Sequence, residues 1–92
     1  MKFIDKVSQG EVYPYAEVSD ENWDKLLACT TEDEVLELLE PGFMTDKEVA
    51  GLYNTMNDNF SFDADLFVGP GFKPIAYAMS LLKEEQKNRD LI

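Results

Sequence analysis

The sequence predicts a small α+β domain, mostly helical, with about four helices and a short antiparallel hairpin or strand pair. Three observations support this fold class. Apolar residues recur at helical spacing in several stretches, two Thr-x-x-Glu capping boxes mark helix starts, and two short N-terminal runs flank a glycine turn. With 92 residues, 45% of them apolar, the chain is expected to form one compact acidic domain over residues 1–92. An all-α fold with irregular ends is the alternative.

The N-terminal part is expected to form the hairpin. Two short runs, residues 2–7 and 11–18, are separated by Ser8, Gln9 and Gly10. Pro14 cannot donate a backbone hydrogen bond, so any strand that contains it is an edge strand. An extended arm lying over the helices is the other interpretation of this segment.

A first helix is expected to begin after Ser19, a favourable N-cap residue that is followed by acids in the first turn. Its apolar stripe consists of Trp23, Leu26, Leu27 and Thr30. The spacing therefore predicts that Leu26 and Leu27 face the core together.

A second short helix is expected directly afterwards. Thr31 and Glu34 have the spacing of a capping box, and Pro41 with Gly42 ends the helix. The residues predicted to face inward are Val35, Leu36, Leu38 and Leu39.

The third helix begins at a capping box of Thr45 and Glu48 and is predicted to end at the turn-like residues 57–59. Its stripe is Val49, Leu52, Tyr53 and Met56. Residues 60–66 then alternate between apolar and polar side chains, which predicts a half-buried strand.

A fourth helix is expected from Lys73, with Pro74 in its first turn, where proline is tolerated. Its buried stripe is Ile75, Ala78, Met79 and Leu82. Glu85 and Arg89 are spaced as an i,i+4 ion pair, expected on the exposed side.

Charge is the most informative property for function. Residues 17–40 hold nine acids and one base, so this window carries −8 of the chain's net charge of −11. Such a field repels nucleic acid and anionic membranes and attracts basic protein surfaces. The expected partner is therefore a basic, nucleic-acid-binding protein, with no direct contact to nucleic acid or membrane. The alternative is that the acids only confer solubility.

Several kinds of chemistry are disfavoured. The chain has no histidine, which excludes Ser-His-Asp and Cys-His catalytic groups, and a single cysteine, Cys29, which excludes an intrachain disulfide. We expect no enzyme, no cofactor and no metal site. Residues 57–65 are rich in oxygen ligands but do not fit the EF-hand pattern, and a polar turn is the alternative. The N-terminus lacks the apolar run of a signal peptide, so we expect a cytoplasmic location.

Together these features predict a non-enzymatic inhibitor or decoy that occludes the nucleic-acid-binding surface of a basic partner, in the manner of a DNA mimic. The chain is similar in size and acidity to small phage-encoded inhibitors of host nucleases and of CRISPR effectors, although no motif links it to a family. Trp23 is either a further anchor or a core residue. The alternatives are an immunity protein that neutralises a nuclease toxin and a self-assembling structural subunit. The residues expected to contact the partner are Glu17, Asp20, Glu21, Asp24, Asp33, Glu34, Glu37, Glu40, Tyr13 and Tyr15.

Overall fold

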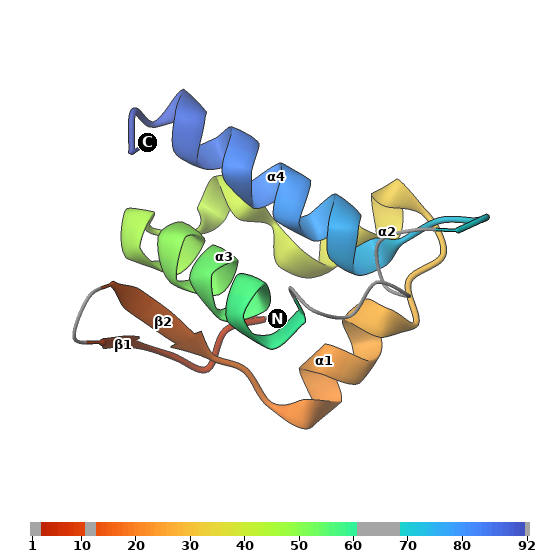
Figure 1. The fold of residues 1–92 in the computed structure, drawn as a ribbon, viewed down its shortest axis with the longest axis horizontal. Helices are drawn as coiled ribbons and strands as arrows, with labels where there is room; N and C mark the ends of the chain where they lie inside the picture. The colour runs from red at the N-terminus through yellow and green to blue at the C-terminus, as the bar shows by residue number, and fades with distance from the viewer. Residues whose placement is uncertain (1–2, 11–12, 61–68, 92) are drawn as a thin grey trace.

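A computed structural model describes residues 3–10, 13–60 and 69–91 and confirms the predicted fold class, with four helices and one two-stranded antiparallel sheet in this part of the chain (Figure 1). The elements in chain order are β1 (Lys6–Gln9), β2 (Pro14–Glu17), α1 (Asp20–Leu27), α2 (Glu32–Leu39), the 3₁₀ turn η1 (Pro41–Phe43), α3 (Asp46–Phe60) and α4 (Pro74–Asn88).

Helix α3 is the centre of the fold. Strand β2 and helix α4 make the most extensive contacts with it, and α1 and α2 pack against α4 (Figure 1). The stripes predicted for α3 and α4 supply a large part of the core, since Val49, Leu52, Met56, Ile75, Ala78 and Leu82 are all buried. None of the helices in the described ranges is both long and apolar enough to span a bilayer.

The outer edge of β2 is closed by side chains of α3. The hydroxyl group of Thr55 accepts a hydrogen bond from the Ala16 backbone N–H (2.8 Å) and donates one to the Ala16 carbonyl (3.1 Å). The amide of Asn54 donates to the Pro14 carbonyl (2.9 Å). These bonds are possible because Gly51 lets the helix approach the strand, and a Cβ atom there would lie 3.2 Å from the Tyr15 carbonyl carbon.

The prediction of which side of α1 faces the core is wrong, because the helix is rotated about its axis relative to that prediction. Leu27 is 42% exposed, whereas Asn22, Leu26 and Cys29 are buried. The physical reason is a tertiary contact, since the side-chain amide of Asn22 donates to the backbone carbonyl of Phe3 (2.9 Å) and turns this face inward. Trp23 is half-buried in the fold.

Trp23 lies between two aromatic rings at the edge of the core. Its ring meets Phe3 at a centroid distance of 5.7 Å and Phe60 at 5.4 Å, both edge to face. This is a favourable aromatic geometry, and it supports the core alternative for Trp23.

Two further predictions are corrected. Leu36 of α2 is 39% exposed rather than inward-facing. Helix α3 continues through residues 57–59 to Phe60, because Phe60 packs on Trp23 and the Asp58 carboxylate accepts a hydrogen bond from the Tyr13 hydroxyl (2.7 Å). Phe60 therefore belongs to a helix, and the rest of the strand predicted over 60–66 lies outside the described residues.

Candidate functional site

The acidic residues predicted to bind a partner are all exposed, and they lie on three elements. Helices α1 and α2 contact each other, and the α1 residues that line the hollow between them are Lys25 and Cys29 rather than acids. Glu17, Tyr13 and Tyr15 belong to the hairpin region, which packs on α3 and lies at the opposite end of the molecule from the start of α2 (Figure 1). The structure thus separates the tyrosines of the hairpin from the acids at the start of α2.

The junction of α1 and α2 is an open hollow of about 340 Å³, lined by Lys25, Cys29, Glu34, Glu37 and Leu38. Lys25 interrupts the acidic surface here and pairs with Glu21 one turn earlier (3.6 Å). The Cys29 thiol donates to the Lys25 carbonyl (3.3 Å). Burial, followed by the charge of Glu34, raises the pKa of Cys29, which keeps the thiol protonated and disfavours a nucleophilic role.

Glu34 belongs to the helix cap. Its Oε1 atom accepts hydrogen bonds from the Thr30 hydroxyl (2.7 Å), the Thr30 N–H (3.2 Å) and the Thr31 hydroxyl (3.3 Å). In return, the Glu34 N–H donates to the Thr31 hydroxyl (3.2 Å), which completes the predicted capping box. The bonds from Thr30 in particular lower the pKa of Glu34. Its first role is therefore to hold the start of α2.

The second half of α2 combines acids with exposed apolar surface. Leu36 has Glu32 and Asp33 one turn before it and Glu40 one turn after it, so carboxylates flank it on both sides along the helix. Phe43 follows in η1 and is 88% exposed. We refer to Asp33, Leu36, Glu37, Glu40 and Phe43 as the α2–η1 surface.

The turn that presents Phe43 is firmly held. Within it, the Phe43 N–H donates to the Glu40 carbonyl (3.0 Å) and the Met44 N–H donates to the Pro41 carbonyl (3.2 Å). Pro41 and Met44 are both buried. A small cavity of about 60 Å³ lies beside the turn, lined by Phe3, Ile4, Leu39, Glu40, Phe43, Met44 and Glu48.

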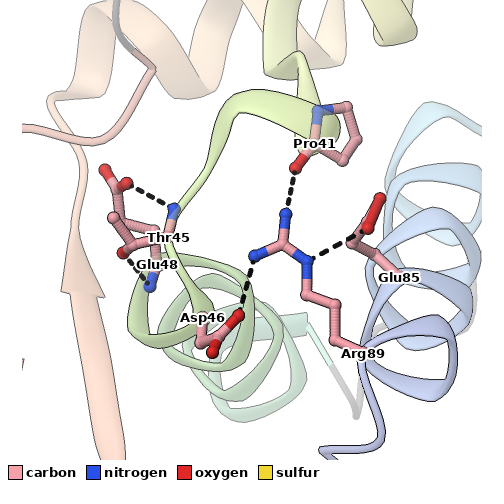
Figure 2. Close-up of polar contacts among 6 residues, drawn as sticks. All are labelled: Pro41, Thr45, Asp46, Glu48, Glu85 and Arg89. Carbon is pink, nitrogen blue, oxygen red and sulfur yellow. Dashed lines mark hydrogen bonds and ion pairs between the residues drawn. The ribbon is translucent and has the colours of Figure 1, made fainter.

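Arg89 fastens this turn to the rest of the molecule (Figure 2). Its guanidinium donates to the Pro41 carbonyl (3.0 Å), to Asp46 at the start of α3 (3.0 Å) and to Glu85 of α4 (3.1 Å). Burial alone lowers the pKa of Arg89, but the bonds to Glu85 and Asp46 outweigh that effect and raise it. The Glu85–Arg89 pair was predicted to be exposed, yet the two side chains are only 24% and 20% exposed, because Arg89 also reaches a buried carbonyl.

Tyr13 and Tyr15 are each 40% exposed. The Tyr13 hydroxyl is engaged with Asp58, and this hydrogen bond, followed by burial, raises the pKa of Tyr13. Tyr13 therefore ties the hairpin to the end of α3, whereas Tyr15 lies on the open face of the sheet.

The sequence-based interpretation did not include Leu36 or Phe43 in the site. The signal for Phe43 is that it follows a Pro-Gly turn and fits no apolar stripe. The described residues contain no group of three or more side chains suited to hold a metal ion, and part of the 57–65 stretch lies outside them. Comparison with protein-family models, curated proteins and solved structures gave no match to this chain.

Proposed function

We propose that this chain is a non-enzymatic acidic inhibitor of a basic, nucleic-acid-binding protein in the cytoplasm. It binds through the α2–η1 surface and occludes the groove that the partner's nucleic acid occupies. The observation that carries the proposal is the combination of two exposed apolar side chains, Leu36 (39%) and Phe43 (88%), with the acids around them.

The apolar part supplies affinity. Burying an exposed phenylalanine side chain is worth about 1.5–3 kcal/mol, and buried aromatic anchors are common among interface hot spots. Phe43 stands on a turn that is already ordered by the Arg89 bond to Pro41, so little conformational entropy is lost on binding.

The acids supply steering and selectivity. Carboxylates one helical turn apart are about 6 Å apart along the axis, which is sparser than the phosphates of one DNA strand at about 3.4 Å. Helix α1, which contacts α2, carries further exposed acids, and its Lys25 lines the hollow between the two helices. The expected partner therefore has an apolar pocket bordered by lysine and arginine, and its association with this chain weakens with salt.

The test compares two double variants that change the net charge equally. Glu37→Lys/Glu40→Lys alters the α2–η1 surface, and Asp5→Lys/Glu84→Lys alters exposed acids outside it. Each protein, with the wild type, is immobilised and exposed to nuclease-treated lysate of the source organism, and bound proteins are eluted with salt and identified by mass spectrometry.

A specific partner is retained by the wild type and by Asp5→Lys/Glu84→Lys and is lost with Glu37→Lys/Glu40→Lys. The purified partner should then release its nucleic acid when wild-type protein is added. If both double variants retain the same proteins, or if the partner keeps its nucleic acid, the proposal is wrong. Phe43→Ser, which keeps every charge, should weaken the same contact at all salt concentrations.

A further inference from the structure

The backbone hydrogen bonds of the hairpin show which groups of each strand point outward. β1 and β2 pair with Lys6 opposite Glu17 and Ser8 opposite Tyr15, and the Gly10 N–H donates to the Tyr13 carbonyl (3.0 Å). In an antiparallel ladder, hydrogen-bonded and non-hydrogen-bonded pairs alternate. Lys6, Ser8 and Gly10 therefore direct their backbone groups toward the partner strand, and Val7 and Gln9 direct theirs away from it.

The two outer edges of this sheet differ. On β2 the outward groups belong to Pro14 and Ala16, and Asn54 and Thr55 of α3 bind them. On β1, no residue within the described ranges hydrogen-bonds to the outward N–H and C=O groups of Val7 or Gln9. One edge of the hairpin is thus closed by α3 and the other is open to a further strand.

We propose that a second copy of this chain pairs with the open edge of β1 and forms a four-stranded sheet across a twofold axis at Ser8. In this antiparallel register Val7 lies opposite Gln9 of the second copy, and Gln9 lies opposite its Val7. Each of these hydrogen-bonded pairs contributes two bonds. The seam between the two β1 strands therefore uses the outward N–H and C=O groups of Val7 and Gln9 in both copies.

Other registers use these groups less well. Centring the axis on Val7 would require Asp5 to pair with Gln9 of the second copy, but the Asp5 N–H already donates to the Glu17 carbonyl (2.9 Å). The register centred on Ser8 needs no change in the hairpin.

The side chains fit the same register. Lys6 falls opposite Gly10 of the second copy and Ser8 falls opposite Ser8, so no like charges face each other within residues 6–10, the described part of this pairing. Ala16 is buried, so Tyr15, its neighbour in β2, lies on the opposite, exposed face together with Ser8. The two Tyr15 rings, each 40% exposed, would lie on either side of the two Ser8 residues at the axis. Each ring could then pack over these small side chains.

Charge makes this association distinguishable from partner binding. Both copies carry −11, so their repulsion opposes pairing, and added salt screens it. Self-association should therefore strengthen with salt, whereas binding of a basic partner to the α2–η1 surface weakens. The inference does not depend on the proposed function. The two proposals can be tested separately, because salt should strengthen self-association and weaken binding of the basic partner.

Gln9→Pro is the matched variant, because the Gln9 N–H points outward and its loss removes no bond to β2. Gln9→Ala is the control that keeps the N–H group. Sedimentation velocity at high protein concentration, in about 0.01 M and about 1 M salt, spans Debye lengths from about 30 Å to about 3 Å. The wild type and Gln9→Ala should dimerise more in high salt. The dimerisation of Gln9→Pro should be weaker than that of the wild type by at least about tenfold.

Amide hydrogen exchange on the wild type tests the seam without a variant. Val7 and Gln9 should become protected as dimer forms, while Ser8, already bonded to β2, should change little. A wild type that stays monomeric in high salt overturns the proposal. A dimer that leaves Val7 and Gln9 unprotected, or that Gln9→Pro does not weaken, also overturns it.

Discussion

Replacing Thr55 with valine tests how the fold closes the β2 edge. Valine has nearly the shape of threonine and a similar helix propensity, so the substitution in α3 removes little except the hydroxyl group. That hydroxyl accepts from the Ala16 N–H and donates to the Ala16 carbonyl, and Ala16 is only 3% exposed. The variant therefore leaves two buried backbone groups without partners.

The expected cost follows from that count. An unsatisfied buried polar group costs about 1–3 kcal/mol, and Thr55 itself is only half-buried, which lets water reach part of the site. We expect the free energy of unfolding to fall by about 2–3 kcal/mol. In a domain of this size the loss corresponds to a decrease in Tm of about 8–24 °C.

Urea unfolding followed by the fluorescence of Trp23 measures this loss. Thr55→Ser is the control, because it keeps the hydroxyl and loses one methyl group, worth about 0.8 kcal/mol or less. Equal dependence on urea in all three proteins would show that the comparison is valid. If the valine variant is as stable as the serine variant, the hydroxyl does not hold the strand edge and our account of the β2–α3 packing fails.

Three more predictions concern other contacts of the fold. Gly51→Ala should lower the free energy of unfolding by about 1 kcal/mol in thermal unfolding, because the added Cβ meets the backbone of β2 and this outweighs the better helix propensity of alanine. Gly42→Ala is the control and should not lower it, because a Cβ there meets nothing within 4 Å. Arg89→Met should cost about 2 kcal/mol in urea unfolding by leaving Glu85 and the Pro41 carbonyl unpaired, and an equally stable variant would contradict the role assigned to Arg89. Because the pKa of Glu34 is lowered in the fold, its contribution to stability is present above its unfolded pKa of about 4.5 and is lost as the pH falls through the folded value. Glu34→Gln should therefore flatten the acid side of the stability–pH curve measured by unfolding, and an unchanged slope would exclude this contribution.

The features predicted correctly from the sequence are those that neighbouring residues determine. Ser19 accepts from the Asn22 N–H (3.3 Å) as an N-cap, and Thr45 and Glu48 exchange the two bonds of a capping box (2.8 and 3.1 Å). Each motif is complete within four residues, so its sequence spacing is sufficient to identify it.

The inward faces of the short helices were harder to predict. Helices α1 and α2 have eight residues each, and leucines occupy neighbouring positions in both. Over two turns such a pattern suits more than one rotation, and contacts with distant residues decide between them, as Asn22 does by binding the Phe3 carbonyl. Leu27 is exposed for this reason, and Leu36 of α2 is exposed as well, so the part that Leu36 contributes to the candidate site was not predicted.

The position of the acids in α2 bears on whether they serve only for solubility. The negative end of the helix dipole lies at the C-terminus, so an acid in the last turn is unfavourable by about 0.3–1 kcal/mol. Glu37 and Glu40 lie there, and the last turn of α2 has no base. The helix dipole favours acids in the first turn, where Glu32, Asp33 and Glu34 lie, so acids that served only for solubility are not expected in the last turn of the same helix. The position of these acids beside an exposed Phe43 is an argument for the proposal that this surface binds a partner. Glu37→Lys/Glu40→Lys should therefore be at least as stable as the wild type in urea while losing the partner, and a clearly destabilised variant would remove this argument.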